Sequence, residues 1–311
     1  MSRILVTPSS FGAFSPDPDR ILADAGMEVI KYSKPGMTED ELIEKLQGCD
    51  AVILGLEPMT AKVMDSCPDL KVVARYGVGM DNVDLEAAKS RGILCFNTPG
   101  ANSDAVADYS FGMMLDLARC ISISNRDLKA HNIGKYTGYG FVGKTLGIIG
   151  LGAIGKCMTK RAKGFGMHVI AYDVYYDEAF CQEYGVKKAS LEQIYRESDF
   201  ITLHCGLNEQ TRGMISMNEL KQMKKTCFLI NNARGGLVNE DDLYEALKTG
   251  VIAGAGIDAF QKEPAVDSPL LTLDNVIGAP HIAGSSQESV NNMGIISAKK
   301  AVEGLAQISN A

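Results

Sequence analysis

The sequence predicts an α/β protein with two doubly wound parallel sheets, one in each of two domains. Short β-rich runs alternate with helical patterns over the first hundred residues, and this alternation predicts parallel strands covered by helices on both faces. The rhythm stops at Pro99 and Gly100, and a second series of strands and helices begins near residue 144. The chain has 311 residues, more than one domain usually holds, so two domains are expected.

The first series contains five candidate strands separated by amphipathic segments. Between the second and third strands, Thr38 stands three residues before Glu41, the spacing of a capping box, and Gly48 ends the segment. This pattern predicts a helix over residues 38–48. The five candidate strands are RILVT (3–7), MEVIKY (27–32), AVILG (51–55), KVVARY (71–76) and ILCFN (93–97).

The second series follows one long helical stretch that is predicted from about Ser103. A domain boundary falls at the Pro-Gly break before that stretch. The chain closes with a helical pattern that starts at about Ser285. The candidate strands of the second series are KTLGIIG (144–150), MHVIAYD (167–173), DFITLHC (199–205), CFLINNA (227–233), IAGAGIDAF (252–260) and NVIGAP (275–280).

The composition limits the partners and the compartment. Hydrophobic residues make up 46% and charged residues 22%, and the formal net charge of −7 gives no general attraction to nucleic acid. The eight cysteines are spread singly, without a CxxC pair or a zinc-like cluster, which fits a reducing cytosol. The N-terminus is typical of a strand rather than a signal peptide, and no long apolar run occurs. We therefore expect a soluble cytoplasmic protein that binds neither nucleic acid, membrane nor metal.

A glycine-rich turn follows the first strand of the second series. Gly150, Gly152 and Gly155 have G-x-G-x-x-G spacing, and Ala153 and Ile154 open a helix-compatible segment. In this context the first glycine permits a tight turn, the second lets the backbone approach a pyrophosphate, and the third allows close packing of helix and strand. The N-terminus of the helix then offers unpaired N–H groups to the phosphates.

The next strand decides how this turn is interpreted. It ends at Asp173, 18 residues after Gly155, where a carboxylate would accept hydrogen bonds from both ribose hydroxyls. A carboxylate there repels a 2′-phosphate, and the residues that follow provide no cation, so the sequence favours NAD over NADP. The alternatives are a methyltransferase-like turn and a purely structural one.

Polar groups follow three later strands, at the edge where open α/β sheets bind ligands. Arg234 precedes two glycines that let the chain turn sharply, Asp258 ends a strand with Glu263 just beyond it, and His281 ends another. Together these groups suit the transfer of a hydride to or from a carbon that bears a hydroxyl beside a carboxylate. Arginine would bind the carboxylate through two parallel hydrogen bonds, and histidine would remove or return the hydroxyl proton.

Glu263 is the candidate for the carboxylate that holds the far ring nitrogen of His281 and stabilises the imidazolium. Each residue also has an ordinary interpretation: Arg234 as a surface cation, Glu263 as part of a solvated run, and His281 as a residue satisfied in a turn. Their occurrence together, downstream of a dinucleotide-type turn, favours the catalytic interpretation. His204 stands at a further strand end, where contact with a cofactor is expected but no acid partner is evident.

Several longer motifs resemble one known family, in the same order along nearly the whole chain. They are ARYGVGMDNVDLEAAKSRGILCFNTPGAN, GKTLGIIGLGAIGK, NNARGGLVNEDDLYEALKTGVIAGAGIDAF and APHIAGSS. The chain resembles the D-isomer-specific 2-hydroxyacid dehydrogenases, in particular their 3-phosphoglycerate dehydrogenase-like branch. The resemblance implies a substrate-binding domain (residues 1–98 and 289–311), a Rossmann-like NAD-binding domain (residues 99–288), catalysis in the cleft between them, and a homodimer formed through the NAD-binding domain.

The resemblance also implies roles for individual residues. Arg234 resembles the arginine that binds the substrate carboxylate, Glu263 the carboxylate that tunes the base, and His281 the acid and base itself. Asp173 resembles the ribose-binding acid, and Asp258 a residue near the nicotinamide amide. The loop that follows Arg75, consisting of Tyr76, Gly77, Val78 and Gly79, is similar to the loop whose backbone N–H groups meet the substrate carboxylate. Other residues expected to line the cofactor site are His204, Cys205, Thr211, Ala233 and Gly284.

The departures from the family concern the substrate. A phosphate-bearing substrate calls for an arginine or lysine cluster, yet the loop after AVILG carries Glu57 and no cation. Arg75 is the only nearby basic candidate. D-3-phosphoglycerate is the first substrate that the resemblance names, and feedback through an appended regulatory domain is not expected. Two alternatives stay open: a reductase of a non-phosphorylated 2-ketoacid of the glyoxylate or hydroxypyruvate type, and a non-enzymatic, NAD-sensing protein similar to corepressors of this fold.

Overall fold

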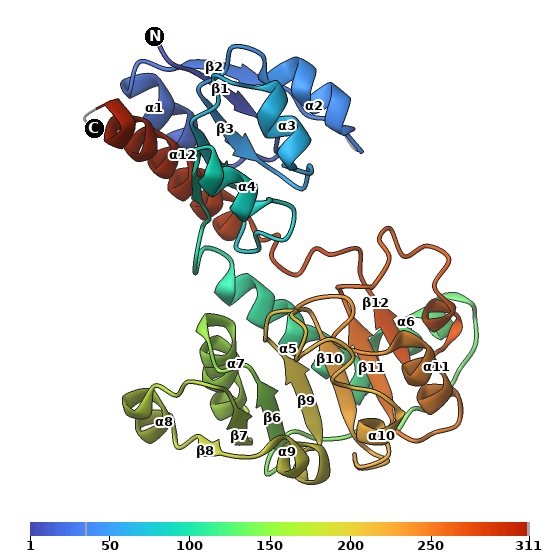
Figure 1. The fold of residues 1–311 in the computed structure, drawn as a ribbon. Helices are drawn as coiled ribbons and strands as arrows, with labels where there is room; N and C mark the ends of the chain where they lie inside the picture. The colour runs from blue at the N-terminus through green and yellow to red at the C-terminus, as the bar shows by residue number, and fades with distance from the viewer. Residues whose placement is uncertain (35, 310–311) are drawn as a thin grey trace. The chain divides into compact units, whose positions relative to one another are not determined.

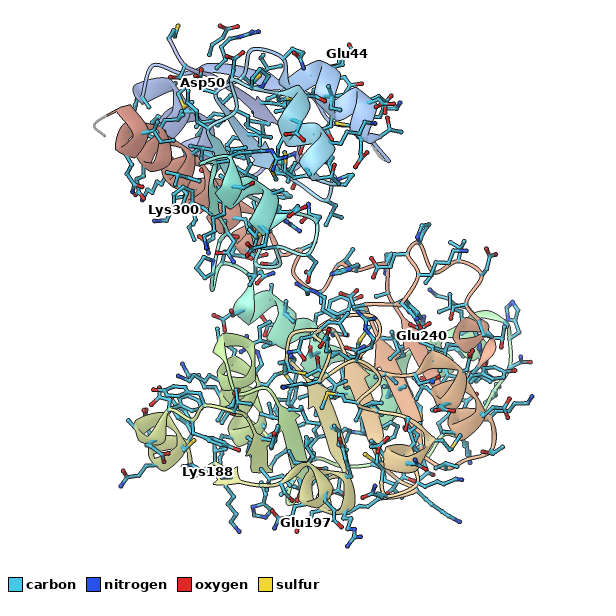
Figure 2. All side chains as sticks on the ribbon, in the orientation of Figure 1. Glu44, Asp50, Lys188, Glu197, Glu240 and Lys300 are labelled. Atoms are coloured by element: carbon cyan, nitrogen blue, oxygen red, sulfur yellow. The ribbon has the colours of Figure 1, made fainter. Side chains whose placement is uncertain are left out.

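The computed structural model describes residues 1–34 and 36–309 and divides into two compact units. The first unit joins residues Met1–Asn102 to Ser285–Ala311, and the second is Ser103–Gly284. The domain boundaries expected from the sequence, after residues 98 and 288, each lie four residues from these limits. In each unit the side chains fill the space between the sheet and its helices, whereas charged groups such as Glu44 and Glu197 point outwards (Figure 2).

The first unit is a five-stranded parallel sheet in the order β2-β1-β3-β4-β5 (Figure 1). All five strands predicted from the sequence are present, each within a residue or two of its expected bounds. The elements of this unit are β1 (Arg3–Val6), α1 (Asp17–Asp24), β2 (Glu28–Lys31), α2 (Glu39–Leu46), β3 (Ala51–Leu54), α3 (Ala61–Ser66), β4 (Val72–Arg75), α4 (Leu85–Ser90), β5 (Leu94–Phe96) and α12 (Gln287–Ser309).

Both faces of the central strands β1, β3 and β4 are buried, which explains why these strands are almost continuously apolar. Successive side chains of a strand point to opposite faces. Leu5 of β1 therefore packs with residues of α2, α3 and α4, whereas its neighbours Ile4 and Val6 pack with residues of α1 and α12. The predicted doubly wound arrangement is confirmed for this unit.

Helix α12 returns the end of the chain to the first unit. In Figure 1 it lies beside α1, and its apolar residues share a core cluster with strands β1, β3 and β4. The phenol of Tyr76, directly after β4, donates a hydrogen bond to the backbone oxygen of Val290 over 2.8 Å. Gly294 and Gly304 lie close to Pro18 and Phe96, so a side chain at either position would collide with the unit's own core.

The second unit is a seven-stranded parallel sheet in the order β12-β11-β10-β9-β6-β7-β8. The six strands expected from the sequence are present, and the short β8 was not expected. The elements are α5 (Ser103–Arg119), α6 (Ile121–Lys129), β6 (Thr145–Ile149), α7 (Ala153–Gly164), β7 (His168–Tyr172), α8 (Glu178–Tyr184), β8 (Lys187–Lys188), α9 (Leu191–Glu197), β9 (Phe200–Leu203), α10 (Met217–Leu220), β10 (Phe228–Asn231), α11 (Glu240–Lys248), β11 (Gly254–Ile257), the 3-10 helix η1 (Pro269–Thr272) and β12 (Val276–Gly278).

Helices cover both faces of this second sheet. Residues of α5 and α7 form one core cluster with β6, β9 and β10, while residues of α9 and α11 form another with the opposite face of the same strands. The strand order reverses between β6 and β9, because β6 pairs with both β7 and β9. A reversal of this kind opens a crevice at the carboxyl ends of the two strands, where doubly wound sheets bind their ligands.

The long helix expected from about Ser103 is two helices, a difference with a local cause. Cys120 separates α5 from α6 and has a left-handed backbone, with φ of 56°. The carboxylate of Asp116 accepts hydrogen bonds from the backbone N–H of Ser122, at 2.6 Å, and from its hydroxyl. These bonds satisfy the start of the second helix and hold the break, which periodicity alone does not indicate.

Two further observations concern the described residues. All eight cysteines are free thiols. Among the helices of residues 1–34 and 36–309, none combines the length and the apolar character needed to cross a membrane.

The capping box at Thr38 gives a test of the fold. The Thr38 hydroxyl accepts from the backbone N–H of Glu41, and the Glu41 carboxylate accepts from the backbone N–H of Thr38, as the spacing predicted. Replacing Thr38 by alanine should lower the free energy of unfolding by about 1 kcal/mol, because the backbone N–H of Glu41 in the first turn of α2 loses its side-chain acceptor. Thr38→Ser keeps the hydroxyl and should change it by much less. Urea unfolding of the three proteins checks this, and equal stability would show that the cap contributes nothing.

Candidate active site

The glycine-rich turn lies where the strand order of the second sheet reverses. Gly150 follows β6 with φ of 99°, and a Cβ there would lie 2.6 Å from the backbone carbon of His204, just after β9. At Gly155 a Cβ would lie 2.2 Å from the backbone oxygen of Gly150. The first and third glycines are therefore required by close backbone packing, as the spacing predicted.

The second glycine leaves an opening at the start of a helix. Gly152 caps α7 without any side-chain hydrogen bond, and a Cβ on it would meet no atom within 4 Å. Within the described part of the chain, the N–H groups of Ala153 and Ile154 meet no acceptor, and the first turn carries no acidic residue. A helix start with open space and unpaired donors suits a phosphate, so these residues fit the pyrophosphate of a dinucleotide.

Asp173 lies directly after β7 and contacts this turn. Its Oδ2 accepts a hydrogen bond from the backbone N–H of Leu151 over 2.5 Å, and its Oδ1 accepts one from Tyr175 over 3.1 Å. Each carboxylate oxygen can accept further hydrogen bonds, so the ribose hydroxyls of NAD fit here as well. Val174 and Tyr175 are 92% and 78% exposed and provide no cation for a 2′-phosphate.

Three other residues expected near the cofactor lie in the loop after β9. The Nε2 of His204 lies 2.9 Å from the Thr202 hydroxyl, its buried Nδ1 has no partner among the described residues, and burial lowers the pKa of His204 to about 3. Burial raises the pKa of the Cys205 thiol. The Thr211 hydroxyl accepts from Asn208 and donates to the Gly206 carbonyl, so it holds the loop together. His204 and Cys205 are thus uncharged at neutral pH.

Arg234 stands on a tight turn after β10. The side chain of Asn231, itself 2% exposed, donates to the Arg234 carbonyl and accepts from the backbone N–H of Ala233. A Cβ at Gly235 would lie 2.1 Å from the backbone oxygen of Phe260, so glycine is needed for this turn to pack against the segment after β11. The Arg234 guanidinium donates to the Ala233 carbonyl over 2.7 Å.

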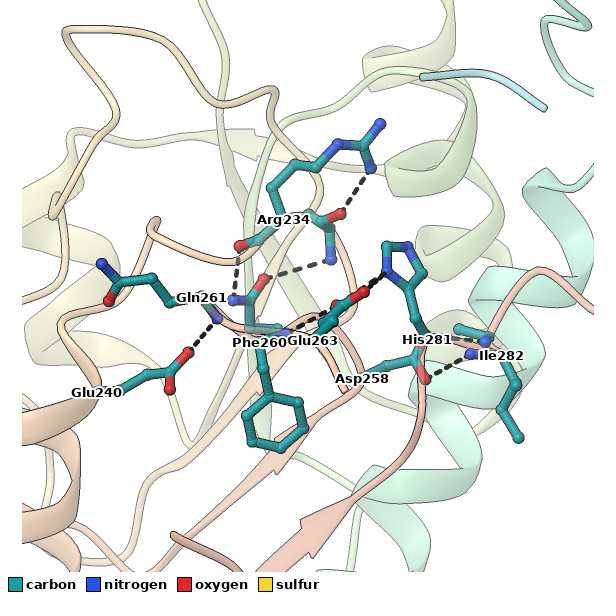
Figure 3. A network of polar contacts seen from close by, with 11 residues as sticks. Arg234, Glu240, Asp258, Phe260, Gln261, Glu263, His281 and Ile282 are labelled. Atoms are coloured by element: carbon teal, nitrogen blue, oxygen red, sulfur yellow. Dashed lines mark hydrogen bonds and ion pairs between the residues drawn. The ribbon is translucent and has the colours of Figure 1, made fainter. Parts of the chain in front are cut away.

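The buried carboxylate of Asp258 holds the loop that carries His281. Asp258 is 1% exposed, and its two oxygens accept from the backbone N–H groups of Ile282 and Ala283, each over 2.8 Å (Figure 3). The backbone N–H of His281 donates to the Asp258 carbonyl over 3.0 Å. His281 has a left-handed backbone, with φ of 58°, which costs a non-glycine residue about 1 kcal/mol and is held here by these three bonds.

Glu263 and His281 form a direct pair. The Nδ1 of His281 lies 2.9 Å from both carboxylate oxygens of Glu263, and the backbone N–H of Phe260 donates to Oε1 of the same carboxylate over 3.1 Å. Nδ1 is therefore the protonated ring nitrogen, and Nε2 is the one that can exchange a proton with a ligand. In Figure 3 the His281 ring and the Arg234 guanidinium extend in the same direction from their loops. The pair that the sequence suggested is present.

Glu240 is a residue of this network that the sequence interpretation missed. It begins α11, and its Oε1 accepts from the backbone N–H of Gln261 over 2.5 Å, which positions the segment that carries Glu263. Burial raises the pKa of Glu240. Its place after Asn239, the N-cap of a helix, suggested only a helix start, because nothing in the local pattern indicates the long-range contact.

The glycine-containing loop after β4 belongs to the first unit. Its carbonyls are occupied: Gly77 accepts from the backbone of Thr98, and Val78 accepts from the side chain of Asn97. Among the described residues, the N–H groups of Val78 and Gly79 meet no acceptor. Arg75 ends β4 and donates to the carbonyl of Tyr76. Gly284, the last predicted cofactor residue, closes the second unit.

Comparison with known proteins identifies relatives over nearly the full chain. A family model described as "D-isomer specific 2-hydroxyacid dehydrogenase, NAD binding domain" matches residues 111–283. A D-3-phosphoglycerate dehydrogenase of Methanocaldococcus jannaschii is 41% identical over 304 residues, which are 96% of this chain and 57% of that protein. A glyoxylate reductase of Korarchaeum cryptofilum is 42% identical over 263 residues, which are 81% of this chain and 78% of that protein.

A solved structure supports the fold in the same way. The crystal structure of a Thermus thermophilus protein called TT0316 has a TM-score of 0.90 and 32% identity and covers 98% of this chain and 97% of its own. This chain spans little more than half of the phosphoglycerate dehydrogenase and about three quarters of the glyoxylate reductase. The two names at nearly equal identity leave the branch open, whereas the family expected from the motifs is confirmed. The chain belongs to the D-isomer specific 2-hydroxyacid dehydrogenase family of NAD-dependent oxidoreductases.

Proposed function

We propose that this protein interconverts a small 2-ketoacid and the corresponding D-2-hydroxyacid with NAD, and that Arg234, Glu263 and His281 carry the reaction. The observation that carries the proposal is the Glu263–His281 pair, in which a carboxylate holds Nδ1 at 2.9 Å and leaves Nε2 for the substrate. The names of the relatives give two substrate classes, phosphoglycerate and glyoxylate. The activity proposed at this level is common to both.

Each side chain has one role in the proposal. The Arg234 guanidinium binds the substrate carboxylate through two parallel hydrogen bonds and fixes the reacting carbon. During reduction, His281 donates its Nε2 proton to the ketone oxygen, and during oxidation Nε2 takes the proton back. Glu263 stabilises the imidazolium that exists on one side of each proton transfer. The bound nicotinamide supplies or accepts the hydride.

The first unit takes part in substrate binding in this proposal. The N–H groups of Val78 and Gly79, which meet no acceptor among the described residues, suit a carboxylate. Asp258 acts by positioning, since both of its oxygens hold the loop of His281. The predicted contact of Asp258 with the nicotinamide amide stays a prediction.

His281 gives the most direct test of this function. His281→Ala should lower kcat for reduction of glyoxylate or hydroxypyruvate by about 10²- to 10⁴-fold, because the variant lacks the imidazole that donates the proton in this proposal. The dissociation constant of NADH should change little. NADH absorbance follows turnover, and NADH fluorescence follows binding. A comparable loss of both would show that the histidine is structural.

Glu263→Gln supplies a graded companion to that test. Glutamine can still accept a hydrogen bond but carries no charge to stabilise the imidazolium, so we expect a loss in kcat of about 10- to 100-fold with NADH binding retained. Glu183→Gln, on the exposed face of α8, is the matched control and should behave as the wild type.

A wild-type protein that binds NADH but reduces no 2-ketoacid would favour the NAD-sensing alternative.

Asp173 tests the choice of cofactor. The wild type should bind NADH at least ~10-fold more tightly than NADPH, because the Asp173 carboxylate accepts ribose hydroxyls and repels a 2′-phosphate. Asp173→Asn should reduce the ratio of the NADPH to the NADH dissociation constant, while its side-chain oxygen still accepts the hydrogen bond from the backbone N–H of Leu151. Fluorescence titrations with both cofactors measure the ratio. Equal binding of NADPH by the wild type would contradict this role for Asp173.

A further inference from the structure

A second ligand-binding edge lies in the first unit, at the point where the order of its sheet reverses. Strand β1 pairs with both β2 and β3, so the order β2-β1-β3-β4-β5 turns back between β1 and β3. Ligands of open α/β sheets bind beyond the carboxyl ends of the strands at such a point. Thr7 follows β1 there, and Gly55 to Glu57 follow β3.

The Glu57 carboxylate is fixed at this edge by Thr7. The Thr7 hydroxyl donates to Oε2 of Glu57 over 2.6 Å and accepts from the backbone N–H of Gly55 over 2.9 Å. Thr7 is 1% exposed, so its orientation is set by the core. A hydroxyl has one proton to give, and the distance to Glu57 is far shorter than the 3.5 Å to the Ile53 carbonyl.

Asn82 ties the loop of Glu57 to the loop after β4. Its side-chain NH₂ donates to the carbonyls of Gly55 and Glu57, over 3.1 and 2.7 Å. Leu54 and Arg75 are register partners, so strands β3 and β4 end at the same height. Neighbouring strands lie about 4.8 Å apart, a spacing comparable to the length of a three-carbon acid. The Glu57 carboxylate and the N–H groups of Val78 and Gly79, which meet no acceptor among the described residues, therefore stand at neighbouring strand ends.

The two strand ends offer opposite chemistry. In the described residues, Oε1 of Glu57 accepts no hydrogen bond, so it can take one from a ligand. The loops after β1, β3 and β4, residues 7–16, 55–60 and 76–84, contain no lysine or arginine. Arg75 precedes the last of these loops, and its guanidinium folds back beside Gly77 and donates to the Tyr76 carbonyl. The edge thus presents N–H donors at β4 and a fixed anion at β3.

We propose that Glu57 selects the distal group of the substrate. It accepts a hydrogen bond from a hydroxyl on the third carbon and repels a phosphate there, so the preferred substrate is a hydroxyl-bearing 2-ketoacid rather than its phosphate ester. This inference rests on the proposed function, since it assigns the substrate class of the same reaction. It favours the hydroxypyruvate type over the phosphoglycerate type.

The test compares hydroxypyruvate with 3-phosphohydroxypyruvate, which differ only by the phosphate. For the wild type, kcat/KM with NADH should favour hydroxypyruvate by at least ~100-fold. Glu57→Gln removes the charge and keeps the shape, and should reduce this ratio by about 10-fold or more. Thr7→Val, which releases the carboxylate without removing it, should reduce the ratio by less. Glu86→Gln, an exposed residue of α4 with the same change in charge, should leave the ratio unchanged.

The outcomes distinguish a failure of the role of Glu57 from a failure of the 2-ketoacid reductase activity. Thermal unfolding of each variant shows that it is folded before its ratio is compared. A wild type that prefers the phosphorylated substrate, or a folded Glu57→Gln protein with an unchanged ratio, would overturn the role of Glu57 while the 2-ketoacid reductase activity stands. If the wild type binds NADH and reduces neither substrate nor glyoxylate, the proposed function fails and this inference fails with it.

Discussion

The hydrogen bond between Glu263 and His281 is the interaction on which the site depends. Neither residue lies on a strand, so both must be held by their neighbours. Glu263 is fixed by the backbone N–H of Phe260, and His281 by the three bonds of its loop to Asp258. The core of the second unit thus fixes one tautomer of an imidazole that is itself 41% exposed. The fixed ring places Nε2, the nitrogen proposed to exchange the proton, at the surface without a search among rotamers.

Each of the two sheets reverses its strand order at one point, and the residues at these two points differ in charge. In the second sheet the order reverses between β6 and β9, and the glycine-rich turn fills that point with helix donors and without acidic side chains in the first turn. In the first sheet the order reverses between β1 and β3, and a carboxylate stands there. One point suits the phosphates of NAD, and the other disfavours phosphate. The same topological feature therefore serves opposite electrostatic tasks.

Local patterns were sufficient to predict the strands other than the short β8, the capping box of α2 and the glycine-rich turn, because each depends on residues close in sequence. The break at Cys120 was not predicted, since it is held by a hydrogen bond that the backbone N–H of Ser122 donates to the Asp116 carboxylate across the break. The contact of Glu240 with Gln261 and the use of both Asp258 oxygens by the His281 loop join segments about 20 residues apart in sequence and leave no local signal. The predicted homodimer concerns a second chain and stays a prediction.

A crystal structure of the protein with NADH and oxamate, an unreactive analogue of a 2-ketoacid, tests the central claim most directly. The account predicts that Nε2 of His281 lies at hydrogen-bonding distance, about 2.6 to 3.2 Å, from the analogue's carbonyl oxygen while Nδ1 stays on Glu263. It also predicts that the Arg234 guanidinium contacts the analogue's carboxylate. A ring that has left Glu263, or an analogue that binds away from Nε2, would contradict the assignment of His281 as the proton donor.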